Sequence, residues 1–195
     1  MFLMKRKFRF IKIIVVIAVA LFLIIGYRIL LFQSKYPPRE DIIVPKGESA
    51  EIMPGVKVRI LDTEILSQED YFSLTEDSRG KDPNMFGVIV KTEMSVDEGY
   101  YMEGTPLKNA FFKTEGYNNM VGYVFQDIKK NEEGKLTAVW SRGYRRIENG
   151  EKRIDYLAVP VGKWNVPDEM WKNIKNKDYT LTVGYYPQYI RMKLY

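Results

Sequence analysis

The chain contains no cysteine and no histidine. These two absences exclude disulfide bonds, a cysteine nucleophile, a Ser-His-Asp triad and the usual ligand sets of a zinc site. A GxGxxG or P-loop phosphate-binding pattern is also missing. We therefore predict no cofactor, no metal ligand and no catalytic residue.

Acidic residues are absent from the first 33 positions, which hold six basic residues. The remaining positions carry 24 basic and 25 acidic residues, a net charge of −1, so the net +5 of the whole chain comes from its beginning. Nucleic-acid binding needs a basic patch on the folded part of a protein. We therefore expect no nucleic-acid partner.

One long apolar run extends from Ile13 to Phe32, and Arg28 is its one charged residue. A helix of this length reaches about 30 Å, enough to cross the hydrocarbon core of a membrane. Its A-x-A match, Ala18-Val19-Ala20, lies in the middle of the run, where cleavage would leave an apolar new N-terminus. The run therefore predicts a retained signal-anchor, and the alternative is a long, cleaved signal peptide.

The flanks of this run predict its orientation. Five basic residues precede it, and Lys35 and Arg39 after it are offset by Glu40 and Asp41. Positive residues stay on the cytoplasmic side, so the cell-membrane anchor is predicted to be single-pass with its C-terminal domain outside. We predict a cytoplasmic tail over 1–12, a transmembrane helix over 13–32, a Pro-containing stalk over 33–42 and an extracytoplasmic domain over 43–195. A large exported domain without cysteine is typical of Gram-positive bacteria.

Alternating apolar residues beyond the stalk indicate β-strands over 56–66 and 86–96. Strand-like runs at 120–128, 136–147 and 152–161 predict an antiparallel meander, with Asn149-Gly150 in a type I′ turn. Residues 179–194 add one or two strands, broken at Pro187. Two short helices are expected, one capped by Ser67 and one opened by Pro167.

These elements predict an all-β fold, an Ig-like antiparallel β-sandwich of about eight strands with two short helices, preceded by a single N-terminal transmembrane helix. A small barrel is the alternative.

Two patterns resemble chemical sites. Ser78-Arg79-Gly80-Lys81 fits S-x-x-K, but Gly80 and Pro83 favour a loop and no S-D-N or K-T-G pattern follows. The acidic residues of 64–82 lack the spacing of a calcium loop, so a solvated loop is favoured and calcium binding stays open.

The charge is divided unevenly along the exported part. Residues 40–103 hold 15 acidic and 6 basic residues, whereas 104–195 hold 10 acidic and 16 basic ones. Five basic residues flank the Asn149-Gly150 turn and are our candidate contacts for a protein partner or an anionic wall polymer outside the cell. They are Arg142, Arg145, Arg146, Lys152 and Arg153. Because Arg145 points away from Arg142 and Arg146 on one strand, a twist or bulge is needed to gather all five on one face.

Several stretches together resemble a known kind of protein: KYPP, GESAEIMPGVKVRILDTEIL, SQEDYF, MFGVIVKTEMSV and VPDEMW followed by YTLTVGYYPQYIRMKLY. The chain resembles uncharacterised membrane-anchored or lipoprotein domains of Clostridium- and Bacillus-like bacteria, whose fold is Ig-like. Many of these have an Asn-rich end after the second strand, where this chain has Asp97-Glu98-Gly99. The resemblance implies a fold and carries no site residue to this chain.

Two classes of function follow. The first is a membrane-anchored extracytoplasmic binding or accessory module without catalytic activity of its own, in an envelope complex, an exporter or an immunity-type system. The second is a carboxylate-based enzyme acting on cell-wall or carbohydrate material, because a pair of acids can meet in space without any sequence signature.

Overall fold

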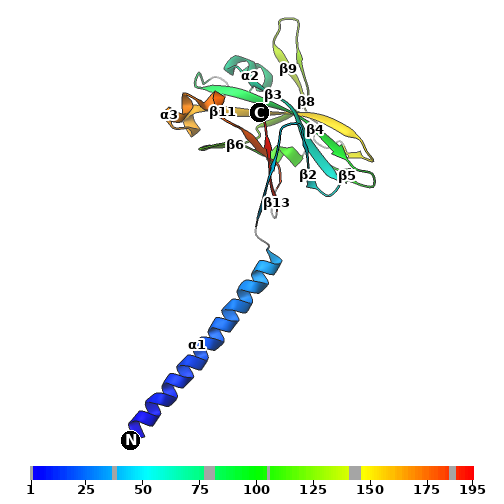
Figure 1. Ribbon diagram of the computed structural model, residues 1–195. Helices are drawn as coiled ribbons and strands as arrows, with labels where there is room; N and C mark the ends of the chain where they lie inside the picture. Colours follow the sequence, from blue (N-terminus) through cyan, green and yellow to red (C-terminus); the bar gives the residue numbers. More distant parts are fainter. Residues whose placement is uncertain (1, 37–38, 77–81, 105, 141–145, 185–187) are drawn as a thin grey trace. The chain divides into compact units, whose positions relative to one another are not determined.

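The computed structural model describes residues 2–36, 39–76, 82–104, 106–140, 146–184 and 188–195 (Figure 1). The chain divides into two compact units, Met1–Glu40 and Asp41–Tyr195.

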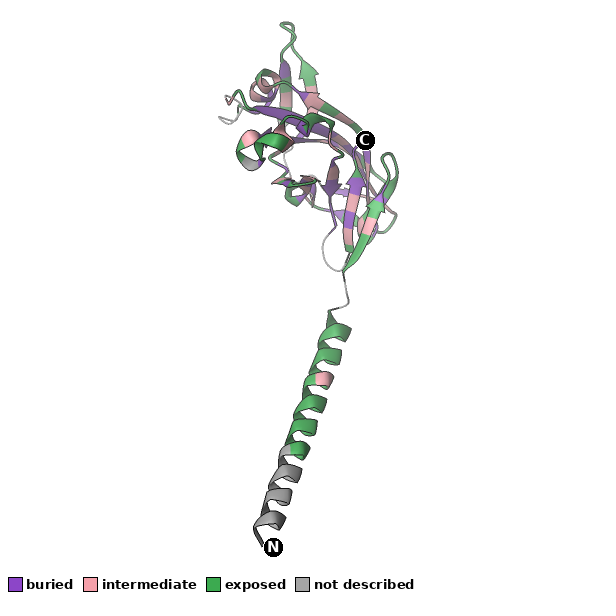
Figure 2. Ribbon diagram, turned by 60° about the vertical axis from the view of Figure 1, so that its left-hand side comes forward, coloured by how far each residue is buried: buried purple, intermediate pink, exposed green. Residues whose placement is uncertain are grey.

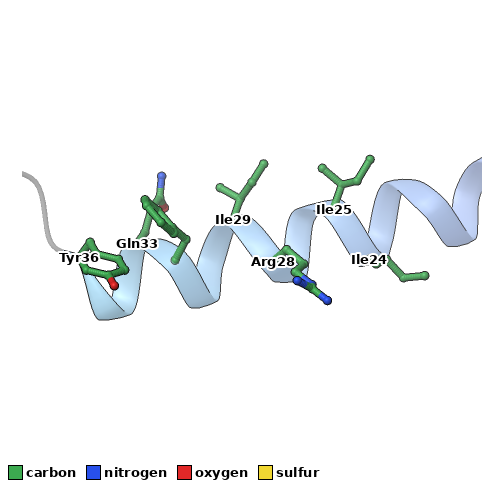
Figure 3. A pocket seen from close by; sticks show the side chains of 7 residues that line it. Ile24, Ile25, Arg28, Ile29, Gln33 and Tyr36 are labelled. Atoms are coloured by element: carbon green, nitrogen blue, oxygen red, sulfur yellow. The ribbon is translucent and has the colours of Figure 1, made fainter.

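The first unit is built on one long helix, α1 (Phe2–Lys35). Its stretch Val15–Lys35 is long and apolar enough to cross a membrane, and a signal sequence satisfies the same criteria. Nearly every described side chain of this stretch is exposed (Figure 2). Ile25 and Ile29 project from one side of the helix and Arg28 from another (Figure 3). All residues that line this hollow come from the same segment, 24–36, so it is a furrow on the surface of α1. The predicted stalk is partly helical, since α1 continues to Lys35.

The second unit is a β-sandwich, as the sequence predicted. Sheet A has five strands in the order β1-β13-β12-β6-β7, and sheet B has six in the order β2-β3-β4-β11-β8-β9. A small ribbon pairs β10 with β5. The strands are β1 (Glu40–Val44), β2 (Ser49–Met53), β3 (Val56–Leu66), β4 (Met85–Val96), β5 (Tyr101–Met102), β6 (Phe111–Thr114), β7 (Tyr117–Met120), β8 (Tyr123–Lys130), β9 (Leu136–Trp140), β10 (Ile147–Glu148), β11 (Lys152–Gly162), β12 (Thr180–Thr182) and β13 (Gln188–Lys193).

The main core lies between the two sheets, and β4 supplies its centre. This strand pairs with β3 on one side and β11 on the other, so it cannot reach solvent at either edge. The face predicted from alternation is confirmed, because all six of its members are buried: Phe86, Val88, Val90, Thr92, Met94 and Val96. Figure 2 shows this buried band running through the middle strands of the sandwich.

A second, smaller core covers the other face of sheet B. Helix α2 (Gln68–Thr75) packs there against β3, β4 and β9. Its Tyr71 is fully buried, and Leu74 joins Phe125 in the same cluster. The cap predicted at Ser67 is confirmed, because the Asp70 N–H donates to Ser67 Oγ at 3.0 Å. The Ser67 hydroxyl in turn donates to the Asp70 carboxylate at 2.7 Å.

Replacing the cap should weaken the fold measurably. Ser67→Ala leaves the first turn of α2 without this acceptor, so the free energy of unfolding should fall by about 0.5–2 kcal/mol. Ser67→Asp, which keeps an acceptor at the same position, should restore most of that loss. Urea denaturation of the three proteins measures the effect, and equal midpoints for wild type and Ser67→Ala would contradict the role of the cap.

The predicted meander is wrong in its strand order. Asn149 and Gly150 do form the expected tight turn, with φ of 52° and 82°, and the Glu151 N–H donates to the Glu148 carbonyl at 3.1 Å. However, β10 pairs with β5, and β11 pairs with β4 and β8. The turn therefore connects two sheets, and β8 lies between β11 and β9. Residues 141–145, part of the predicted central strand, lie outside the described residues.

The second predicted helix is shorter than expected. α3 covers Asp168–Trp171 after Pro167, and a separate 3₁₀ turn follows at Ile174–Asn176. Two more 3₁₀ turns lie at Pro106–Asn109 and Lys163–Asn165. The Ile174 carbonyl accepts a 2.6 Å hydrogen bond from the buried Tyr179 hydroxyl. Tyr179 also stacks on Phe112, with 4.5 Å between ring centroids, so this segment is fixed to the main core.

Tyr179 should make the fold sensitive to alkali. Burial, with Tyr117 and Tyr195 nearby as further causes, raises the pKa of Tyr179 well above its usual 10.0. The unfolded chain then loses this proton at a lower pH than the folded chain. The free energy of unfolding should therefore be unaffected below about pH 10 and fall above it by about 1.4 kcal/mol per pH unit. Denaturation of wild type and Tyr179→Phe from pH 8 to 11 should show a shallower decline in the variant, and parallel curves would contradict this assignment.

Candidate binding groove

Two consecutive strands, β1 and β2, end different sheets. β1 is the terminal strand of sheet A and β2 is the terminal strand of sheet B. A tight turn joins them, in which the Glu48 N–H donates to the Pro45 carbonyl at 3.2 Å. Because only this turn separates the strands, the open edges of both sheets lie on the same side of the sandwich.

A groove of about 620 Å³ lies at this side. Ile42 and Val44 of β1 and residues 49–54, which include β2, line it, and Gly184, Gln188 and Ile190 complete the lining. Strands β2 and β13 lie next to each other here (Figure 1). This volume falls within the usual range for a ligand site, about 300–1,000 Å³.

The strand pattern explains the apolar part of the groove, which also has the polar residues Ser49, Glu51 and Gln188 in its lining. Ile42 and Val44 alternate with exposed neighbours, as do Ala50 and Ile52 on β2, so each strand turns small or branched apolar side chains inward. Gly184 packs closely against Ile190, because a Cβ at this position would lie 2.7 Å from Cγ1 of Ile190. The floor is thus formed by Val44, Ala50 and Ile190, which are buried.

The segment that contributes β1 and β2 to the groove is acidic. Residues 40–54 contain four acidic residues and one lysine. Of the acids, Glu51 lines the groove itself, and its carboxylate accepts the Gly55 N–H at 2.8 Å. Ile43 and Met53 add exposed apolar surface beside these charges. The groove therefore combines an apolar floor with the carboxylate of Glu51, which favours positive charge.

The basic residues predicted as contacts do not share one face. Arg142 and Arg145 lie outside the described residues. Arg146 is exposed, lies 4.2 Å from the centroid of the Tyr101 ring and pairs with Glu148 at 3.1 Å. Lys152 is exposed and pairs with Glu93 at 3.3 Å. These two remain candidates for a contact surface, each with an acidic neighbour.

The prediction that Arg153 is a surface contact is wrong. Its side chain is only 8% exposed, and it points into the sandwich because Leu157 and Val159 of the same face belong to the main core. Its Nη2 donates to Asp155 Oδ2 at 3.0 Å and to the Gly104 carbonyl at 2.9 Å. Burial raises the pKa of the Asp155 carboxyl, and Arg153 opposes that shift. Arg153 is therefore part of the interior and cannot meet a partner at the surface.

Neither chemical pattern from the sequence can be placed in a site. Ser78–Lys81 and part of the 64–82 acidic stretch lie outside the described residues. In the ranges that the structure describes, no three or more Asp or Glu residues come together as metal ligands. Glu51 is the single acid among the described residues that line the groove.

The sequence does not predict the groove, because Ile42 falls within the predicted stalk. Its signal was the alternation in EDIIV and SAEIM on either side of PKGE, which reads as two short strands around a turn. The pattern does not predict that these two strands belong to different sheets, because the neighbour of β1 is β13, about 150 residues further along the chain.

Comparison with known proteins gives a structural similarity without a matching family. No family model matches the chain, and neither does a curated protein. Among solved structures, the chain is similar to an uncharacterised β-sandwich protein from Clostridium difficile 630, with 13% sequence identity and a TM-score of 0.46. The match covers 80% of this chain and 96% of that one.

Proposed function

We propose that the chain is a membrane-anchored extracytoplasmic binding module, without catalytic activity of its own, that holds an extended segment of a partner protein in the β1–β2 groove. The observation that carries this proposal is the groove, which has an apolar floor and lies beside two terminal strands. Open strand edges offer backbone donors and acceptors, and adjacent pockets for alternate side chains supply specificity.

The chemistry of the groove specifies its partner segment. The apolar floor favours alternating apolar side chains. The net charge of −3 over residues 40–54 favours lysine or arginine beside them. Such a module fits an accessory role in an envelope complex, an exporter or an immunity-type system.

The anchor is expected to be retained in the mature protein. α1 presents a 21-residue apolar stretch, and its small-residue pattern lies inside that stretch rather than after it. Mass spectrometry of the membrane-bound protein should give the full-length value near 22.9 kDa. A mature N-terminus at Leu21 or Tyr27 would show instead that α1 is a cleaved signal sequence.

Site-specific photocrosslinking in the native membrane tests the groove. A photoreactive residue at Met53, which lines the groove and is 41% exposed, should give one discrete adduct with a partner protein. Met120, 47% exposed on β7, is the matched control and should give no such adduct.

The carboxylate of Glu51 provides the second readout. Glu51→Lys reverses the charge inside the groove and should reduce the Met53 adduct, most strongly at low salt, because exposed charges steer association. Equal adducts from Met53 and Met120, or no effect of Glu51→Lys, would argue against a partner in this groove.

A further inference from the structure

The outward face of sheet A carries a second set of residues, separate from the groove. Phe112, Leu181 and Ile190 point into the main core. Because side chains alternate along a strand, their neighbours project from the opposite face of the sheet. These neighbours include Phe111 and Lys113 on β6, Thr182 on β12, and Tyr189 and Arg191 on β13.

This face is basic. Strands β6, β7, β12 and β13 contain three cations, Lys113, Arg191 and Lys193, and no acidic residue. The acid that the structure brings to them is Asp41 of β1, 3.8 Å from Arg191.

On the outward face of sheet B, two cations of β3 form ion pairs with acids. Lys57 pairs with Asp97 at 2.8 Å, and Arg59 pairs with Glu93 at 2.9 Å.

Two buried donors on this face have no hydrogen-bond partner within the described part of the chain. They are Thr182 Oγ1 and Arg191 Nε. Thr182 is fully buried, and it lies directly opposite Arg191 in the β12–β13 register. Buried polar groups are nearly always hydrogen-bonded, so two neighbouring donors without an acceptor indicate a site for one.

Lys113 covers these donors. Lys113 is on β6, opposite Thr180 of β12. Its ammonium reaches the Tyr189 hydroxyl on β13. Because β12 lies between β6 and β13, this contact crosses β12 diagonally over Thr182. The ammonium is 4.9 Å from the Tyr189 ring centroid and 5.6 Å from that of Phe111. A long lysine side chain held by one hydroxyl and two ring faces can turn towards an anion without moving the backbone.

We infer that this face binds a phosphate group. The Arg191 guanidinium and the Thr182 hydroxyl donate to its oxygens, and the Lys113 ammonium moves from Tyr189 to a third oxygen. Donors arriving from three neighbouring strands suit a tetrahedral oxyanion, which presents separate oxygens, better than a planar carboxylate. Phe111 and Tyr189 then flank the group that carries the phosphate.

Phosphate binding is tested on the full chain in uncharged maltoside micelles, by thermal unfolding in potassium phosphate against potassium chloride at equal ionic strength. Binding to the native state alone raises the unfolding midpoint. Wild type should show a larger rise than Arg191→Gln and Thr182→Val. Arg59→Gln is the matched control, since Arg59 also lies on a strand, forms an ion pair and has an unpartnered Nε. It should keep the wild-type rise and so accounts for the general effect of phosphate as a salt.

A second arm identifies the source of the phosphate. The same four proteins in nanodiscs with increasing phosphatidylglycerol are compared by hydrogen exchange over residues 180–193. Protection by inorganic phosphate points to a soluble phosphate, and protection by phosphatidylglycerol alone points to a lipid headgroup. Either result, lost in Arg191→Gln and Thr182→Val and kept in Arg59→Gln, supports the site. No response in both arms, or the same response in all four proteins, overturns it. Because none of these residues lines the groove, the site and the groove can fail separately.

Discussion

Replacing Asp155 by alanine is expected to lower the free energy of unfolding by about 3–5 kcal/mol. The substitution leaves the Arg153 guanidinium buried without its counter-charge. Nε and Nη2 of Arg153 both donate to Asp155 Oδ2, at 3.2 and 3.0 Å, and Asp155 is fully buried. An unpaired buried charge is far costlier than the loss of an exposed pair.

Removing both charges should reverse most of that loss. The pair is imperfect, because Asp155 Oδ1 has no hydrogen-bond partner within the described residues. Buried ion pairs can be replaced by apolar residues with little cost or even a gain of about 1–4 kcal/mol. Arg153→Met with Asp155→Leu should therefore be far more stable than Asp155→Ala.

Chemical denaturation of the wild type, the single variant and the double variant gives this comparison. Asp97→Asn serves as the control, because the Lys57–Asp97 pair is nearly half exposed on both sides. It should cost no more than about 1 kcal/mol. If Asp155→Ala and Asp97→Asn cost the same, Arg153 is not buried as described.

Adding one methyl group at Gly87 is expected to destabilise the fold by about 1–3 kcal/mol. Gly87 lies on β4, and a Cβ there would lie 2.3 Å from Cδ2 and 2.9 Å from Cβ of Tyr71. Tyr71 is fully buried between α2 and sheet B, so its ring cannot turn aside without opening the second core.

Gly162→Ala is the matched control at the end of a neighbouring strand. There a Cβ would lie 2.1 Å from the Trp164 ring, which is an equally close approach. Trp164 is 47% exposed, however, and its ring can swing into solvent. Thermal unfolding should show a clear loss for Gly87→Ala and a small change for Gly162→Ala. Equal losses would mean that Tyr71 yields as readily as Trp164.

Local patterns predicted the individual elements well because they depend on neighbours in sequence. The alternation of 86–96 identified the buried face of β4, and Ser67 was recognised as a cap. Strand order was less accessible, because pairing depends on distant partners. Asn149-Gly150 form the expected turn, yet they lead from a ribbon with β5 into the centre of sheet B.

The candidate sites were largely beyond the sequence for the same reason. Arg153 is predicted as a surface cation because its neighbours in sequence are basic. It lies on the same face of β11 as Leu157, and that face points into the core. The sequence gives no signal for a site at Lys113 and Arg191 beyond an aromatic residue two positions before each, in 111–113 and 189–191. Only the register of β12 with its two neighbours brings these side chains onto one face.

The position of β1 has a consequence for folding during synthesis. β1 is the first strand of the sandwich to be synthesised, and its neighbour in sheet A, β13, is the last. Sheet A therefore cannot close until the other strands have been synthesised, which is typical of slow-folding, high-contact-order topologies. Until then, the apolar side of β1, with Ile42 and Val44, remains exposed. Completion of sheet A therefore depends on the arrival of β13, and deletion of Gln188–Lys193 would leave β1 without its neighbour.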